Sequence, residues 1–335
     1  MSISRRNILG VAIGATALAA SASARAQQWG DPPTPAAGDP KAPVWPPAEH
    51  FNLWPAGKMP NAPATLPTPT GTMNGPANAR ELWLTGVAEP HVGVFRPARP
   101  DGRSVLIIPG GGYRFVSVHN EGIDVAAALT AQGITCFVLV YRLPGEGWSN
   151  RADVPLQDAQ RAMRLIRARA ATWGIKADKL GMIGFSAGGH LASMLAVGHS
   201  DPIYAAIDAA DVQSALPAYA GLGYAVTSFT SAGNEGRTSN GLWGASADGG
   251  TMARYDALAR VTSDTPPSFL IHAMNDGSVP IRQSIAWMEA CLAARVPVEA
   301  HLLQTGGHGF GAAHLPENSP GRVWPLQFAR WTAGF

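Results

Sequence analysis

From about residue 80 to the end of the chain, short apolar runs alternate with segments whose apolar residues recur at every third or fourth position. The short runs are typical of strands buried on both faces of a sheet, and the longer spacing is typical of helices. The predicted strands are 81–85, 92–95, 104–108, 134–143, 180–185, 219–227, 268–273 and 298–303. The predicted helices are 121–132, 156–170, 188–197, 281–292 and 323–332. Because strands and helices alternate, we expect an α/β fold with a mostly parallel central sheet flanked by helices on both faces, and ligands at the carboxyl ends of its strands.

The segment 27–79 has a different pattern, because twelve of the 28 prolines lie between Pro32 and Pro69. Proline lacks a backbone N–H, so this density predicts no regular helix and no sheet ladder. Apolar side chains from Trp45 onward argue against a pure linker. We therefore expect a mobile first part, a second part that lies on the domain surface, and a catalytic domain over residues 80–335.

The first 26 residues are typical of an export signal. Arg5 and Arg6 precede an apolar run over residues 8–20, and an A-x-A cleavage site follows at residues 24–26. Paired arginines indicate the twin-arginine route, and the apolar run is too short and too rich in Gly and Ala for the alternative, a membrane anchor. We expect cleavage, a periplasmic or secreted protein, and no stable membrane association afterwards.

Removing the predicted signal changes the charge. The whole chain carries 25 basic and 23 acidic residues, but three arginines and no acid belong to residues 1–26, so 22 basic residues remain and the formal net charge becomes −1. Without a basic stripe, nucleic acid and anionic lipid are poor candidates as partners. The two cysteines, Cys136 in a predicted strand and Cys291 in a predicted helix, are interpreted as buried free thiols rather than a disulfide.

The segment Gly184-Phe185-Ser186-Ala187-Gly188 matches the G-x-S-x-G pattern between a predicted strand and a predicted helix. In that context the glycines allow a sharp turn that exposes the serine hydroxyl. We predict Ser186 as a nucleophile, although the pattern alone also fits an ordinary Gly-rich turn.

Three glycines follow the strand 104–108 and predict an oxyanion hole, which such a nucleophile needs. Acyl transfer needs backbone N–H groups aimed at the developing oxyanion, and Gly111, Gly112 and Ala187 are the predicted donors. A flexible turn or a phosphate loop are the alternatives, but no Gly-Lys-Ser/Thr follows, which excludes a Walker-type loop.

Asp276 and His308 are the predicted acid and base. Asp276 follows the strand 268–273, and His308 lies between glycines just after the last predicted strand. The order Ser186, Asp276, His308 is the order of the triad in one hydrolase fold. The rival carboxylates follow no predicted strand as directly; they are Asp248, Asp256 and Asp264. The remaining candidate histidines are interpreted as structural, with His272 at the border of the site; they are His190, His272, His301 and His314.

Several runs together resemble the bacterial acetyl-xylan and feruloyl esterase (BD-FAE-like) branch of the α/β hydrolases, and more loosely the hormone-sensitive-lipase-like carboxylesterases. The runs are Pro109-Gly-Gly-Gly-Tyr-Arg114, Glu121-Gly122, Val140-Tyr-Arg-Leu-Pro144, Asp158-Ala-Gln-Arg-Ala162, Ile183-Gly-Phe-Ser-Ala-Gly-Gly-His-Leu191, Thr265-Pro-Pro and Gly306-Gly-His-Gly-Phe310. The resemblance implies the α/β-hydrolase fold and a serine esterase acting on carbohydrate esters, such as acetyl-xylan, with no cofactor and no metal. Two departures are Pro109, where the lipase-like group often has histidine, and the Gly/Ser-rich stretch 230–250, which matches no specificity element.

Four aromatic residues are weaker candidates for lining an acyl or sugar pocket: Tyr113, Trp148, Trp243 and Phe310. The alternatives to a carbohydrate esterase are a general short-chain carboxylesterase, a lipase, a prolyl-oligopeptidase-type peptidase and an inactive hydrolase that only binds carbohydrate or protein. The stretch 230–250 is too rich in Gly and Ser to serve as a lipase lid, and the chain has no room for a propeller.

Overall fold

The computed structural model describes residues 33–230, 237–245 and 247–335. The predicted export signal and part of the Gly/Ser-rich stretch 230–250 therefore lie outside the described residues. Across these described ranges, no helix is both long enough and apolar enough to cross a lipid bilayer.

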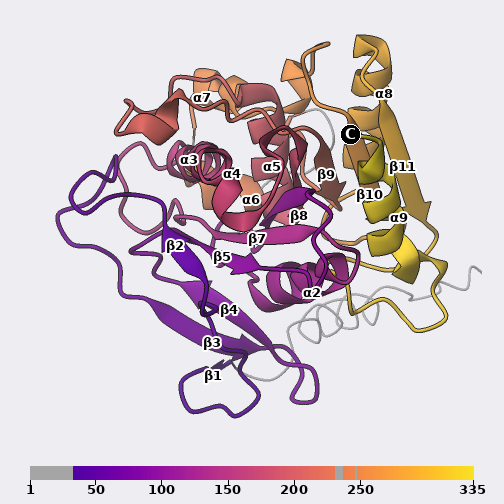
Figure 1. Cartoon of the computed structure of the whole chain (residues 1–335), viewed down its shortest axis with the longest axis horizontal. Coiled ribbons are helices and arrows are strands. Elements are labelled where there is room, and N and C mark those ends of the chain that lie inside the picture. The colour runs from indigo at the N-terminus through magenta and orange to yellow at the C-terminus, as the bar shows by residue number, and fades with distance from the viewer. Residues whose placement is uncertain (1–32, 231–236, 246) are drawn as a thin grey trace, which may run out of the picture.

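A mixed sheet of eight strands forms the centre of the described part of the chain, in the order β11-β10-β9-β8-β6-β7-β5-β2 (Figure 1). Its strands are β2 (His50–Asn52), β5 (His91–Phe95), β6 (Ser104–Ile108), β7 (Thr135–Val140), β8 (Leu180–Phe185), β9 (Ala220–Gly223), β10 (Ser268–Ala273) and β11 (Val298–Leu303). In this sheet β5 runs opposite to the other seven strands, so its pairings with β2 and β7 are antiparallel and the remaining pairings are parallel. Every residue of β6 and of β8 is buried, as their continuous apolar runs predict for central strands.

Helices cover both faces of this sheet. On one face α2 (Asp124–Thr130) contacts α9 (Trp324–Trp331), and on the other α3 (Val154–Ala168) contacts α5 (Ser186–Gly198) (Figure 1). The helix α8 (Arg282–Ala294) packs on β10 and β11. Shorter segments are α4 (Ala170–Trp173), α6 (Arg237–Trp243), α7 (Gly249–Arg254), a π-helix (His119–Ile123), and 3₁₀ turns at Ala177–Lys179, Ala209–Val212, Leu258–Arg260, Pro320–Val323 and Thr332–Gly334. The predicted layered α/β arrangement is confirmed.

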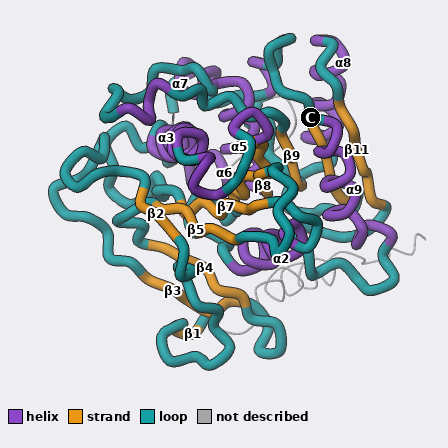
Figure 2. Tube along the Cα trace, viewed as in Figure 1, coloured by secondary structure: helices purple, strands orange, loops and turns teal. Residues whose placement is uncertain are grey.

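The proline-rich segment contains strands, which corrects the prediction that it forms none. The strands β1 (Thr34–Pro35), β3 (Thr70–Asn74) and β4 (Glu81–Thr85) form a small antiparallel sheet beside the main one, and β2 extends the main sheet (Figure 2). The physical reason is placement: β2 and β3 contain no proline, and β1 is an edge strand. Edge strands tolerate a missing N–H donor.

A buried ion pair anchors this segment to α3. The Arg142 and Asp158 side chains are both inaccessible and lie 2.8 Å apart. Trp54 donates its indole N–H to Asp158 Oδ1 at 2.7 Å, and Arg142 donates to the Pro60 carbonyl. The prediction that residues from Trp45 onward lie on the surface is therefore wrong at Leu53 and Trp54, which are buried in the core.

Asp158→Asn is expected to lower the free energy of unfolding by about 3–5 kcal/mol, because it leaves the Arg142 charge buried without a counter-ion. The matched control is Asp208→Asn, whose carboxylate is 41% exposed and whose partner Arg161 keeps Asp211. We expect this control to lower the free energy of unfolding by about 1 kcal/mol or less. Urea unfolding of both variants measures the difference, and equal losses would contradict the buried-pair argument.

Both cysteines are buried and free, as predicted.

Candidate active site

Ser186 occupies a sharp turn at the carboxyl end of β8. It is the first residue of α5, its φ is +53°, and it is 9% exposed. The turn is crowded: a Cβ at Gly184 would lie 2.2 Å from the Gly188 carbonyl oxygen, and one at Gly188 would lie 2.2 Å from the Ile108 carbonyl oxygen. Only glycine fits at these two positions, so the G-x-S-x-G pattern here reflects a real steric need. The strained serine is held at the sheet edge, as expected for a nucleophile elbow.

His308 lies in the loop after β11 and reaches this serine. The Ser186 Oγ and His308 Nε2 atoms are 2.9 Å apart, and the His308 side chain is 19% exposed. The loop is fixed by Asn275, whose Oδ1 accepts hydrogen bonds from the Gly306 and Gly307 amides. The imidazole is thus placed to take the serine proton while one side remains open to solvent.

Asp276 completes a hydrogen-bonded chain. Its Oδ2 lies 2.7 Å from His308 Nδ1 and 3.1 Å from His272 Nε2, and its Oδ1 accepts the Ser278 and Val279 amides, each at 2.8 Å. Burial raises the pKa of this carboxyl, but the hydrogen bonds with His272 and His308 outweigh burial, and the pKa lies well below its usual range. Asp276 is therefore an anion at neutral pH and orients the imidazole of His308.

The structure thus brings together Ser186, His308 and Asp276, which local motifs had singled out separately. The rival carboxylates lie elsewhere: Asp256 accepts from Ser228 and Thr230, Asp248 caps α7, and Asp264 is exposed. His272 borders the site by contacting Asp276. The other histidines have structural partners: Tyr113 and the Tyr255 carbonyl for His190, Glu299 for His301, and Glu81 for His314.

The loop after β6 lies against the nucleophile. A Cβ at Gly110 would lie 2.9 Å from Ser186 Cβ. The Gly110 N–H donates to Glu121 Oε2 and is therefore occupied, whereas the Gly111 and Gly112 amides donate to no other described residue. Ala187 lies in the first turn of α5, where amides have no intrahelical partner. The three predicted donors are thus free to bind an oxyanion.

The helix α6 lies on the outer side of this loop. A Cβ at Gly241 would lie 2.0 Å from the Gly112 carbonyl oxygen, so the backbones of helix and loop are in contact. Arg151 holds α6 there by donating to the Gly241 and Leu242 carbonyls. This described part of the Gly/Ser-rich stretch 230–250 is therefore next to the candidate oxyanion loop.

Three of the four aromatic residues predicted to line a pocket are buried instead. Tyr113, Trp148 and Phe310 are each at most 5% exposed. Tyr113 bonds to His190, Trp148 packs against Arg142, and Phe310 packs against Tyr224. These contacts occupy the rings and leave no face for a sugar, which corrects the expectation. Trp243 is half-buried beside Phe229 and stays a candidate.

Glu121 is a residue of the site to which the sequence analysis gave no role, although it belongs to one of the runs that carry the resemblance. It is buried and joins Gly110 to Tyr224. The available signal was a carboxylate eleven residues after Gly110, at the start of a predicted helix.

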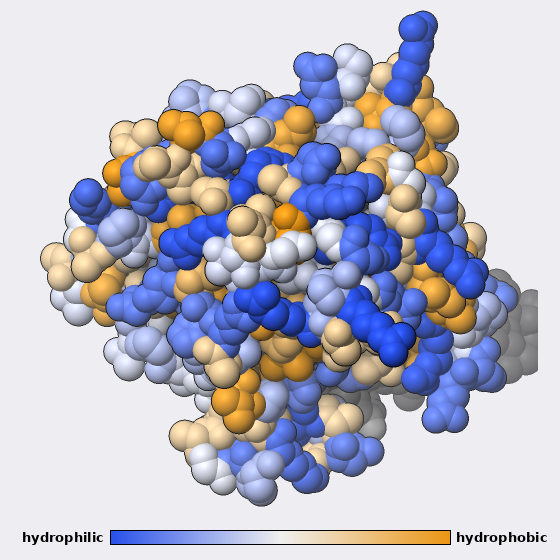
Figure 3. Space-filling view, viewed as in Figure 1, coloured by the Kyte–Doolittle hydropathy of each residue, from blue (hydrophilic) through white to orange (hydrophobic). Residues whose placement is uncertain are grey.

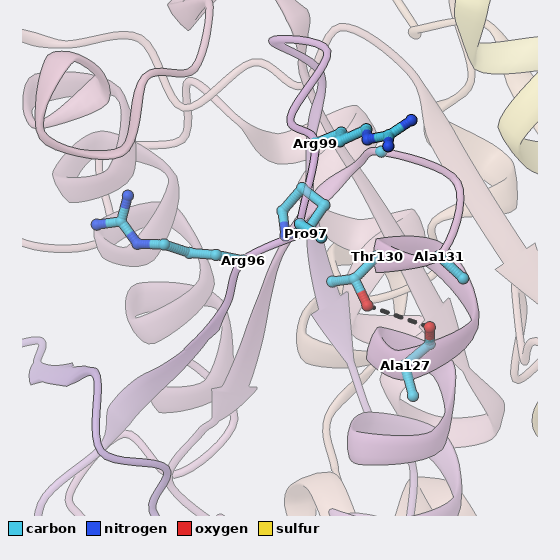
Figure 4. Close-up of a pocket in the computed structure, with 8 residues that line it drawn as sticks. Arg96, Pro97, Arg99, Ala127, Thr130 and Ala131 are labelled. Carbon is cyan, nitrogen blue, oxygen red and sulfur yellow. Dashed lines mark hydrogen bonds between the residues drawn. The ribbon is translucent and has the colours of Figure 1, made fainter.

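The described residues also form a hollow away from Ser186. This hollow of about 450 Å³ is lined by residues of the loop after β5 and of the end of α2, among them Arg96, Arg99 and Thr130 (Figure 4). It lies at the amino edge of the parallel strands, since Phe95 pairs with Cys136 near the start of β7, and so at the opposite edge from Ser186. On the face shown in Figure 3, hydrophobic side chains are scattered among hydrophilic ones. No group of three His, Cys, Asp or Glu within the described ranges could hold a metal ion.

A mostly parallel sheet with helices on both faces, and a Ser–His–Asp chain at the carboxyl edge of its strands, define an α/β hydrolase. Residues 94–291 match the BD-FAE family. The chain belongs to this family.

Relatives with known names agree with that assignment. An acetylxylan esterase of Xylanibacter ruminicola is 30% identical over 221 residues, which cover 65% of this chain and 43% of the relative. Endo-1,4-beta-xylanase B of Butyrivibrio fibrisolvens is 30% identical over 210 residues, which cover 63% of this chain and 33% of the relative. The match thus spans less than half the length of these two relatives. A solved structure of an acetyl ester-xyloside bifunctional hydrolase from Caldicellulosiruptor lactoaceticus superposes with a TM-score of 0.69 at 26% identity, covering 85% of this chain and 96% of that one.

Proposed function

We propose that the protein is a serine hydrolase of carboxylic esters, with Ser186 as nucleophile, His308 as general base and Asp276 as the orienting anion. The observation that carries the proposal is the continuous hydrogen-bonded chain from Ser186 Oγ through His308 to Asp276. Membership of the BD-FAE family and relatives named as esterases support the same reaction class.

The mechanism is acyl transfer in two halves. His308 Nε2 takes the hydroxyl proton while Ser186 Oγ bonds to the ester carbonyl carbon, and the carbonyl electron pair moves onto oxygen. The Gly111, Gly112 and Ala187 amides stabilise this oxyanion. The intermediate collapses, the C–O bond to the alcohol breaks, and the alcohol takes the proton from His308. Water then attacks the acyl-enzyme in the same way and releases the acid and Ser186.

We further propose an acetylated carbohydrate as the substrate. Support comes from the names of two relatives, an acetylxylan esterase and a bifunctional acetyl ester-xyloside hydrolase. Xylan is a polymer outside the cell, so an exported enzyme agrees with this substrate, and the export signal proposed for residues 1–26 would take the protein to the periplasm or beyond. A general short-chain carboxylesterase is the second candidate, because the reacting groups are the same.

A fluorophosphonate tests the reaction class, because it phosphonylates only an activated serine. We expect one adduct per chain by intact-mass spectrometry, and none in a Ser186→Ala variant. A folded wild-type protein without an adduct would favour the alternative of an inactive binding protein.

An ester series tests the substrate. We expect fast acetate release from acetylated xylo-oligosaccharides, and rates on p-nitrophenyl esters that fall as the acyl chain lengthens from two to eight carbons. Faster hydrolysis of the longer esters, or cleavage of a prolyl peptide, would contradict the carbohydrate proposal while leaving the triad intact.

A further inference from the structure

A single buried carboxylate lies between the two loops of the candidate site. Glu121 belongs to the π-helix His119–Ile123, directly before α2, and is 4% exposed. Within the described part of the chain its side chain forms no ion pair with Lys, Arg or His. Burying a carboxylate without a cation costs free energy, and π-helices occur frequently at functional sites. Both features suggest that Glu121 has a role beyond packing.

One oxygen of Glu121 holds the oxyanion loop. Oε2 accepts the Gly110 amide at 2.6 Å. The flanking carbonyls are also bound, because Tyr141 O–H donates to the Pro109 oxygen and the Ser117 amide donates to the Gly110 oxygen. A peptide group is planar, so fixing the Gly110 carbonyl fixes the direction of the Gly111 N–H on the other side of the same plane. Glu121 and Tyr141 therefore fix the Pro109–Gly110 peptide, and the Ser117 amide fixes the next peptide, which contains the Gly111 N–H.

The other oxygen of Glu121 holds the histidine loop. Oε1 accepts the Tyr224 hydroxyl at 2.9 Å, and that hydroxyl accepts the Gly311 amide at 3.0 Å. The Tyr224 ring packs against His308, with ring centroids 5.0 Å apart. Asn120, the neighbour of Glu121, donates to the Gly309 carbonyl at 2.7 Å. The π-helix is thus hydrogen-bonded to the loop on the C-terminal side of His308, through Asn120 directly and from Glu121 through Tyr224.

The fit at Gly311 shows how closely the two segments approach. Its φ is +49°, and a Cβ there would lie 2.1 Å from Asn120 Oδ1.

Burial raises the pKa of the Glu121 carboxyl, and the Gly110 amide and the charge of His308 act against that rise.

We propose that Glu121 is a positioning residue for ester hydrolysis: one carboxylate fixes the oxyanion donors through Gly110 and the general base through Tyr224. This inference rests on the proposed function. It deepens that function by naming the group that holds the oxyanion loop and the histidine loop in a fixed position relative to each other.

Three variants test the proposal with kinetics on an acetyl ester. Glu121→Ala is expected to lower kcat about 100-fold, as for a misplacement of about 1 Å, with KM changed by less than about three-fold. Glu121→Gln should recover kcat to within about ten-fold of wild type, because its amide oxygen can accept from Gly110 and its NH₂ can donate to Tyr224. Adding Tyr224→Phe to Glu121→Ala should lower kcat no further, since the two residues act in one chain.

The matched control is Glu146→Ala. Glu146 is a partly buried carboxylate that also accepts two amides, those of Gly86 and Val87, and it contacts none of the triad residues. We expect this control to keep kcat within about two-fold while losing thermal stability comparable to that lost by Glu121→Ala.

Any of three results would overturn the proposal. Glu121→Ala could keep kcat within two-fold of wild type, it could change KM alone, or Glu121→Gln could fail to recover kcat. Failure of the proposed function is recognised separately: Ser186→Ala would then keep wild-type activity, whatever Glu121 does.

Discussion

Replacing Ser186 by alanine is expected to lower kcat for an acetyl ester by about 10⁶-fold, to the level that the remaining site can supply. Alanine removes the atom that would bond to the carbonyl carbon, and the 2.9 Å contact from Oγ to His308 Nε2 disappears with it. The positive φ at this position is already occupied by a residue with a Cβ, so alanine should fit the turn without new strain. Steady-state acetate release, followed at high enzyme concentration, measures the residual rate.

Ser193→Ala is the control for this variant. Ser193 lies in the same helix, α5, and is buried with its hydroxyl bonded to the His190 carbonyl. Its removal should leave kcat within about three-fold, because a buried hydrogen bond contributes about 1 kcal/mol to stability and none of the reacting atoms are involved. More than one per cent of wild-type activity in Ser186→Ala would rule out this serine as the nucleophile.

Asp276→Asn is expected to lower kcat by about 10⁴-fold with little change in fold. Asp276 Oδ2 accepts the proton on His308 Nδ1, which leaves Nε2 unprotonated to receive the serine proton. An asparagine NH₂ facing Nδ1 would instead favour the tautomer with the proton on Nε2, and that tautomer cannot act as base toward Ser186. The change removes charge but keeps shape, so a folded and inactive enzyme is the expected result.

The rival carboxylates provide the comparison for Asp276. Asp248→Asn and Asp264→Asn alter exposed groups and should change kcat less than about two-fold, as ordinary surface substitutions do. Circular dichroism should be unchanged in all three variants. If either control loses as much activity as Asp276→Asn, the assignment of the acid is wrong.

The parts of this molecule that could be predicted from sequence are those with a local physical signal. The strands β6, β8 and β10 have the predicted bounds because each is a continuous buried run, ended by Pro-Gly, by serine or by a polar turn. The strand β11 also has its predicted bounds, although its residues are only partly buried. Ser186 is recognisable for the same reason, since the steric demands of its turn are met by Gly184 and Gly188 within five residues.

Other features depend on tertiary contacts and have no local signal. The predicted strand 219–227 ends at Gly223, because Tyr224 leaves the extended conformation with a φ of +34°. The Tyr224 ring packs against His308. The predicted helix 121–132 begins as a π-helix, which places Glu121 between two loops from distant parts of the chain. Likewise β2 and β3 form only because partner strands are available, despite the prolines around them.

The attachment of the proline-rich segment bears on how the chain can be shortened. The family match begins at residue 94, inside β5, and a chain trimmed to that boundary would lose β2 and Trp54. The edge of the main sheet would then present unpaired amides and carbonyls, a template for pairing with a second molecule. Such a fragment would carry all three triad residues and still be prone to aggregate. The prolines near β2 thus belong to a segment that shields the sheet edge, and recombinant fragments should retain it.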